Sequence, residues 1–245
     1  MHAGAVASPG VLKRGFRCVL VANGVQIDGI YGWNQPAFTS KGDIVVANFI
    51  QNTVHVVTGA TGAMLHTFGA HGVGPMQFDS PFGVCVSRDD SVLIADWGNH
   101  RIQEVANLGR AGTATLLGVG LLLQPAYTAF TPSEDAIIVR QLGGPNRIVV
   151  LARDGTSILR VLPISADDPI GLFGLAVSRS GVVAAGANNQ QWVLVCSVGG
   201  EWKRKIDTAQ LPALPANLRG VAFDSQERLI TCSHGAKAFV RIAAR

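Results

Sequence analysis

Asp96 and His100 are the two residues of the stretch SVLIADWGNHRIQEV, residues 91–105, whose side chains could transfer protons or bind a metal. On both sides of the polar turn that contains them, apolar side chains alternate with others, a pattern typical of two paired strands. An aspartate that ends such a strand commonly accepts hydrogen bonds from backbone N–H groups of the turn. The pattern therefore favours structural roles for both residues over catalytic ones.

Motifs for covalent catalysis and phosphate binding are missing from the sequence. It holds no Gly-x-Ser-x-Gly elbow, which argues against a hydrolase nucleophile. The glycine-rich stretch GVGLLLQ, residues 118–124, lacks the lysine and the following helix of a phosphate-binding loop. No cofactor is expected.

The chain repeats itself with a period of about 45 residues, which determines the fold class. The copies begin at Pro36, Pro81, Pro125, Ile170 and Leu218, so that successive starts differ by 45, 44, 45 and 48 residues. Each copy holds three or four short β-runs, and fourth strands are expected at 63–69, 113–118, 157–163 and 201–207. Such units predict an all-β fold, a β-propeller of four-stranded antiparallel blades.

The number of blades follows from the residues outside the regular repeats. Residues 36–217 fill four blades, which leaves 35 residues before and 28 after them. Five blades are therefore favoured, and six remain compatible because residues 16–32 resemble a third and a fourth strand. The last copy stops after its third strand, so we expect N- and C-terminal strands to share a blade and hide both edges. We expect residues 1–14 to be a flexible tail and residues 15–245 to be one propeller domain.

The composition is that of a folded protein with a weakly charged surface. Of its 245 residues, 48% are hydrophobic and 15% charged, and the net charge is +4. No apolar run reaches the roughly 18 residues that a membrane span needs, and the N-terminal region lacks the charge order of a secretion signal. The four cysteines are far apart without CxxC spacing, which indicates free thiols. We therefore expect a cytoplasmic, monomeric protein that has no membrane contact.

The stretch FDSPFGVCVSRDDSVLIADWGNHRIQEV, residues 78–105, resembles a repeat of the NHL family. The matching features are Pro-x-Gly-Val, a strand that ends in Ala-Asp, and Gly-Asn-His-Arg-Ile-Gln. The copy at 35–57 keeps the strands but loses this turn, and the three later copies keep only the outline. The resemblance implies a propeller that holds partner proteins, or RNA, on one face. Propellers of similar shape include metal-dependent lactonases and an amidating lyase, so the resemblance alone does not select one function.

Metal ligation has little support in the sequence. A zinc site needs three or four converging ligands, whereas the histidines fall at unlike positions of their blades. These histidines are His2, His55, His66, His71, His100 and His234. Weak calcium candidates, with oxygen-bearing side chains near strand ends, are Asn34, Asp96, Asn146 and Asn188.

A binding rim has better support, because the turns between second and third strands of all blades emerge on the same side of a propeller. The basic and aromatic residues in or beside these turns are Phe49, Trp97, Arg101, Arg140, Arg147 and Lys237. We predict a non-catalytic platform that binds a protein partner through this rim. A metal-dependent lactonase or lyase-like enzyme is one alternative, and single-stranded RNA binding is the other.

Overall fold

The computed structural model divides into two compact units, unit 1 at residues 1–128 and unit 2 at residues 129–245. The structure describes residues 20–22, 25–27, 35–110, 112–144, 147–163, 172–187, 192–207, 218–233 and 238–242. The predicted tail at residues 1–14 lies outside these ranges. The expected single domain stays a prediction, and each unit is described by itself.

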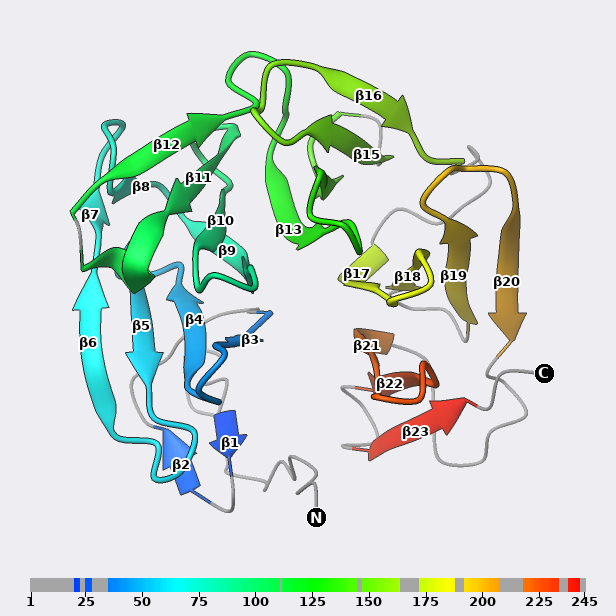
Figure 1. The fold of residues 1–245 in the computed structure, drawn as a ribbon, viewed down its shortest axis with the longest axis horizontal. Helices are drawn as coiled ribbons and strands as arrows, with labels where there is room; N and C mark the ends of the chain where they lie inside the picture. The colour runs from blue at the N-terminus through cyan, green and yellow to red at the C-terminus, as the bar shows by residue number, and fades with distance from the viewer. Residues whose placement is uncertain are drawn as a thin grey trace. The chain divides into compact units, whose positions relative to one another are not determined.

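Unit 1 contains two four-stranded antiparallel sheets (Figure 1). The first sheet consists of β3 (Ala37–Phe38), β4 (Ile44–Asn48), β5 (Thr53–Val57) and β6 (Met64–Phe68). The second consists of β9 (Pro81–Val86), β10 (Val92–Asp96), β11 (Arg101–Val105) and β12 (Ala114–Leu117). A short parallel pair, β7 (Ala70–His71) and β8 (Gln77–Phe78), lies in the connection between them and was not expected from the sequence.

The next sheet begins at the end of unit 1 and continues into unit 2. It consists of β13 (Pro125–Phe130), β14 (Ala136–Gln141), β15 (Arg147–Ala152) and β16 (Ile158–Val161). A fourth sheet holds β17 (Leu172–Val177), β18 (Val182–Ala187), β19 (Trp192–Ser197) and β20 (Lys203–Asp207). The fifth has three described strands, β21 (Leu218–Phe223), β22 (Leu229–Ser233) and β23 (Ala238–Ile242).

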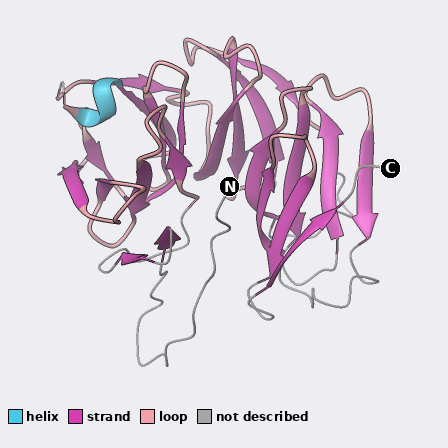
Figure 2. Ribbon diagram, turned by 60° about the horizontal axis from the view of Figure 1, so that its bottom comes forward, coloured by secondary structure: helices cyan, strands magenta, loops and turns pink. Residues whose placement is uncertain are grey.

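These five sheets are the predicted repeats, with each first strand starting within two residues of its predicted position. The four fourth strands also fall inside their predicted ranges. Helix is nearly absent from the described residues, where the only segment is the 3₁₀ turn η1 (Ala106–Gly109) (Figure 2). No helix in the described part of the chain is long and apolar enough to cross a bilayer.

The sharing of a blade by N- and C-terminal strands stays a prediction, because the two units are described separately. β1 (Leu20–Ala22) and β2 (Val25–Ile27) pair with each other in a separate two-stranded sheet. β23 pairs with β22 in the three-stranded sheet of described strands. Asn23 and Gly24 stand between β1 and β2 in the sequence, and this dipeptide favours a local hairpin.

Apolar runs in the middle strands form the core of each unit. All five residues of β4 and of β10 are buried, because each of these strands is covered on both faces. In unit 1 the two sheets share one cluster of buried side chains that includes Val45, Val54, Phe78, Val84 and Ile94. In unit 2 a smaller cluster of Ala184, Val193, Val195 and Leu229 packs the fourth sheet against the fifth.

One turn, between the first and second strands, has the same geometry in all five sheets. The residue three positions after the first residue of the turn has a positive φ and donates its N–H to the carbonyl of that first residue. The first residues are Thr39, Ser87, Thr131, Ser178 and Asp224, and their partners are Gly42, Asp90, Glu134, Gly181 and Glu227. This turn therefore marks the repeat even where the sequence does not.

Substitution of Gly83 tests how closely the first strands β9 and β13 approach one another. A Cβ there would lie 2.7 Å from the Ala126 carbonyl oxygen and 3.1 Å from Tyr127 Cα, both backbone atoms that cannot swing away. We expect Gly83→Ala to lower the free energy of unfolding by about 2 kcal/mol. Gly74→Ala is the matched control, because its nearest neighbour is the movable Gln77 side chain at 3.1 Å. Equal urea midpoints for the two variants would contradict the close approach.

Candidate binding surface

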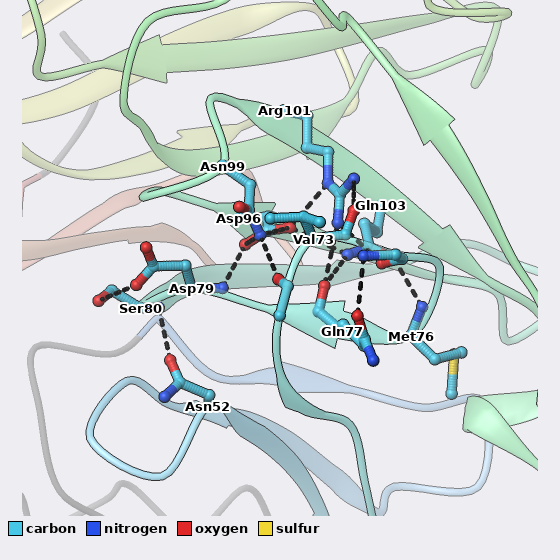
Figure 3. Close-up of polar contacts among 12 residues, drawn as sticks. Asn52, Val73, Met76, Gln77, Asp79, Ser80, Asp96, Asn99, Arg101 and Gln103 are labelled. Carbon is cyan, nitrogen blue, oxygen red and sulfur yellow. Dashed lines mark hydrogen bonds and ion pairs between the residues drawn. The ribbon is translucent and has the colours of Figure 1, made fainter.

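Asp96 lies at the centre of the polar network in unit 1 (Figure 3). Its side chain is fully buried. Oδ2 accepts hydrogen bonds from Arg101 Nε at 2.8 Å and Gln103 Nε2 at 2.9 Å. Oδ1 accepts from the Asp79 backbone N–H at 2.8 Å, and Asn99 Nδ2 lies within 3.1 Å of both oxygens. The carboxylate is thus satisfied by protein donors, as a buried charge must be.

The remaining donors of this network hold the connection that leads into β9. Arg101 donates from Nη1 to the Val73 carbonyl at 2.6 Å and from Nη2 to Gly74 at 2.9 Å and Gln77 at 3.0 Å. Gln103 donates to the same Gln77 carbonyl and accepts from the Met76 N–H at 3.0 Å. The Asp96–Arg101 ion pair therefore fastens an irregular segment whose carbonyls would otherwise lack donors.

This arrangement corrects two of the predicted roles. Asp96 is not an available calcium ligand, because hydrogen-bond donors surround both of its oxygens. Arg101 is only 6% exposed and does not lie on a binding rim. The other calcium candidates, Asn34, Asn146 and Asn188, fall outside the described residues. Within the ranges that the structure describes, no three His, Cys, Asp or Glu side chains come together as a metal site.

The first sheet carries an uncharged version of the same network. Asn48 ends β4 as Asp96 ends β10. Asn48 Nδ2 donates to Gln51 Oε1 at 2.9 Å and lies 3.3 Å from His55 Nε2. His55 also contacts the Thr67 hydroxyl through Nδ1 at 2.8 Å. Asn48, Gln51, Thr53 and His55 therefore occupy the places of Asp96, Asn99, Arg101 and Gln103.

Asn52 in the first sheet and His100 in the second each contact the residue that precedes the first strand of the following sheet. The Ser80 N–H donates to Asn52 Oδ1 at 2.7 Å, and the Gln124 N–H donates to His100 Nδ1 at 3.0 Å. Both acceptor residues have a φ of 56°, in the left-handed region that a turn residue adopts. The equivalent contacts support the structural role expected for His100.

The other residues of the predicted rim differ in burial. Phe49 is half-buried and packs on Phe82 with ring centroids 6.2 Å apart, and Phe82 contacts Tyr127 edge-on at 6.0 Å. Trp97 is half-buried, and its indole nitrogen has no hydrogen-bond partner among the residues that the structure describes. In unit 2, Arg140 is fully buried and Arg147 is half-buried, while Lys237 lies outside the described residues. Burial removes Arg101 and Arg140 from the basic rim, because a buried side chain cannot contact a partner.

The turns at 49–52 and 97–100 emerge on the same side of unit 1 as the connections at 69–80 and 118–124, and we call these four segments the connector face. In a four-stranded antiparallel sheet, the second strand ends on the side where the fourth strand ends. Gly98 N–H donates to the Asp79 carbonyl and Asn99 Nδ2 donates to the Gly72 carbonyl, both at 2.8 Å. The bonds from Ser80 to Asn52 and from Gln124 to His100 tie in the other two segments. The connector face is therefore one contiguous surface.

Large apolar side chains on the connector face are exposed to solvent. They are Ile50, Val73, Val119 and Leu123, with exposed fractions of 56%, 75%, 62% and 43%. The four segments contain no Lys or Arg, and Asp79 is their only acidic residue. The rim predicted from the sequence did not include these residues, although an apolar residue inside a turn of a repeat is a signal that could have found them.

Comparisons with known proteins agree with this geometry. Structures of β-propeller proteins align with most of the chain, so the fold is a β-propeller. Residues 78–104 match the family model described as NHL repeat, which confirms the resemblance found in that stretch. No curated protein sequence is detectably similar to the chain.

Three of the similar solved structures differ in function. Virginiamycin B lyase from Staphylococcus aureus is 13% identical over 86% of this chain and 66% of its own, with a TM-score of 0.63. A nidogen/laminin complex is 12% identical over 90% and 82%, with a TM-score of 0.68. Kuenenia stuttgartiensis hydrazine synthase is 13% identical over 85% and 60%, with a TM-score of 0.62. The chain thus spans about two thirds of the lyase, and these identities show the fold alone.

Exchanging the charged network for its uncharged counterpart tests the role of the Asp96–Arg101 pair. Arg101→Thr leaves the Asp96 carboxylate buried without its cation, and we expect a loss of about 3–5 kcal/mol in the free energy of unfolding. Adding Asp96→Asn copies the Asn48 and Thr53 positions of the first sheet and should recover at least about 1 kcal/mol. Urea unfolding of the two single variants and the double variant measures this coupling. Additive losses would show that the two side chains act independently.

His55 gives unit 1 a sensitivity to acid. Burial lowers the pKa of His55 below its ordinary value, so the folded state disfavours the charged imidazole. The unfolded chain binds the proton first as pH falls below about 6.5, and stability is lost from there down through the folded pKa. We expect the thermal midpoint to fall between about pH 7 and pH 5. His55→Gln, which copies Gln103, should flatten this part of the profile, and an unchanged slope would contradict the assignment.

Proposed function

We propose that the protein is a non-catalytic binding platform and that the connector face of unit 1 binds an apolar segment of a partner protein. The observation that carries this proposal is the exposure of Ile50, Val73, Val119 and Leu123 on one surface without Lys or Arg. Exposed apolar side chains that lie together commonly mark a protein interface. The half-buried Phe49 and Trp97 on the same face add aromatic surface, which is enriched at such interfaces.

The residues capable of chemistry on this face support a platform rather than an enzyme. Asp96 and Arg101 are engaged with each other and with the connection, and His100 Nδ1 accepts a backbone N–H. A similar propeller comes from the nidogen/laminin complex, which supports protein partners in general. Similarity to virginiamycin B lyase keeps an enzyme as the alternative. Elemental analysis of the purified protein separates the two, because stoichiometric bound metal would favour the enzyme.

Single-stranded RNA binding is less well supported than protein binding. The predicted rim depended on positive charge, and two of its cations, Arg101 and Arg140, are buried. The connector face supplies no lysine or arginine that could contact phosphate groups.

Site-specific photo-crosslinking tests the platform. A benzoyl-phenylalanine at position 73 should capture a defined partner in the cells that make the protein, whereas one at exposed Met64 on β6 should not. With that partner purified, Val73→Asp should weaken binding at least about tenfold, because it would bury an unpaired carboxylate. Met64→Asp is the matched control and should change the affinity less than about twofold. Equal effects of the two substitutions, at unchanged thermal midpoints, would contradict the proposal.

A further inference from the structure

His100 lies at the junction between the β10–β11 turn and connection 118–124 of the connector face. Its Nδ1 accepts the Gln124 backbone N–H at 3.0 Å, and the ring is exposed to solvent. A neutral imidazole accepts at one nitrogen only, so this contact assigns the ring proton to Nε2. An imidazolium has an N–H group at both nitrogens and accepts at neither. Protonation of His100 therefore replaces this hydrogen bond by two opposed donors.

The equivalent junction of the first sheet uses a side chain that does not titrate. Asn52 Oδ1 accepts the Ser80 N–H at 2.7 Å (Figure 3). An asparagine amide keeps the same donors and acceptors from neutral to mildly acid pH. Arg101 also donates to carbonyls of connection 69–80 and keeps its charge in acid. Acid should therefore loosen connection 118–124 and leave connection 69–80 in place.

No carboxylate is described in contact with His100 that would hold a charged ring in its present position. Connection 118–124 contributes no acidic or basic side chain. Asp96 is fully buried and is paired with Arg101. The other acidic, basic and phenolic residues on the elements around this junction are His71, Asp79, Glu104 and Tyr127. A proton added at Nδ1 of His100 therefore faces the N–H of Gln124.

Release of connection 118–124 would change the apolar surface that the proposed function uses. Val119 of this connection is 62% exposed. Gln124 has a φ of 48°, a strained conformation that the hydrogen bond to His100 helps to hold. We propose that protonation of His100 releases connection 118–124, so that the connector face loses part of its binding surface in acid. The proposal rests on the proposed function for its effect on affinity, whereas the release itself occurs in the free protein.

Hydrogen exchange of single backbone amides tests the release, measured by NMR on the full chain without a partner. Protection factors are corrected for the intrinsic exchange rate at each pH. From about pH 7.5 to about pH 5, the range in which histidine changes charge, protection of the Gln124 amide should fall. We expect this fall to be at least about fivefold larger than that of the Ser80 amide, because one hydrogen bond is lost. Equal changes at the two amides would overturn the proposal.

Two variants separate His100 from the other histidine of the connector face. His100→Asn copies Asn52 and keeps an acceptor, so the ratio of the two protection factors should change less than about twofold over this range. His71→Asn is the matched control, because it removes an exposed histidine from connection 69–80 and should keep the wild-type response. A wild-type response in His100→Asn, or its loss in His71→Asn, would show that another group controls the connection.

Affinity gives a separate measurement of the consequence. For the partner captured through position 73, the Kd of the wild type should rise at least about threefold over the same pH range, because a released connection must be ordered again on binding. The Kd of His100→Asn should rise less than about half as much. The same pH dependence in both proteins would overturn the loss of binding surface. Failure to capture any partner would contradict the proposed function, and the amide measurement would still decide whether His100 releases the connection.

Discussion

The ion pair between Asp96 and Arg101 is the interaction on which the best-defined part of unit 1 depends. A buried carboxylate is tolerated only when donors surround it, and here the donors come from four residues of three segments. The arginine that neutralises the charge also supplies hydrogen bonds to three carbonyls of the connection before β9. One pair of side chains thus holds the β10–β11 hairpin, an irregular segment and the start of the first strand of the same sheet, β9, in place.

The first sheet shows that an ion pair is not required at these positions. Asn48, Thr53 and His55 fill the same positions without any formal charge at neutral pH, and the hydrogen bonds described for them include partners in the sheet and in its own turn. Both sheets keep the hydrogen bond that joins them to the following sheet. Asn52 and His100 each accept an N–H from the residue that directly precedes the first strand of that following sheet. The constraint common to the repeats is therefore satisfaction of backbone groups at sheet junctions, and charge is an addition in the second sheet.

The sequence was informative where the controlling pattern is local. Alternation and turn residues predicted the strands of all five sheets, because strand and turn formation depend on neighbouring residues. Closure by the terminal strands stays a prediction, since pairing between segments so far apart in the chain leaves no local pattern. Arg101 and Arg140 were assigned to a rim because an arginine beside a turn is usually exposed. Their burial depends on tertiary contacts, such as the need of the Val73 carbonyl for a donor, which no single stretch of sequence displays.

The network and the proposed binding surface are physically linked through Val73. Its carbonyl accepts from Arg101 Nη1 at 2.6 Å, while its side chain is 75% exposed. A connection fixed through its carbonyls cannot turn its side chains inward, because the sheet below already fills that space with the Asp96 network. Asp96, which first suggested catalysis, therefore acts beneath the surface through Arg101, and together they keep an apolar side chain in water at a defined position. Such preorganisation lowers the entropic cost of binding and is what a rigid platform contributes to a complex.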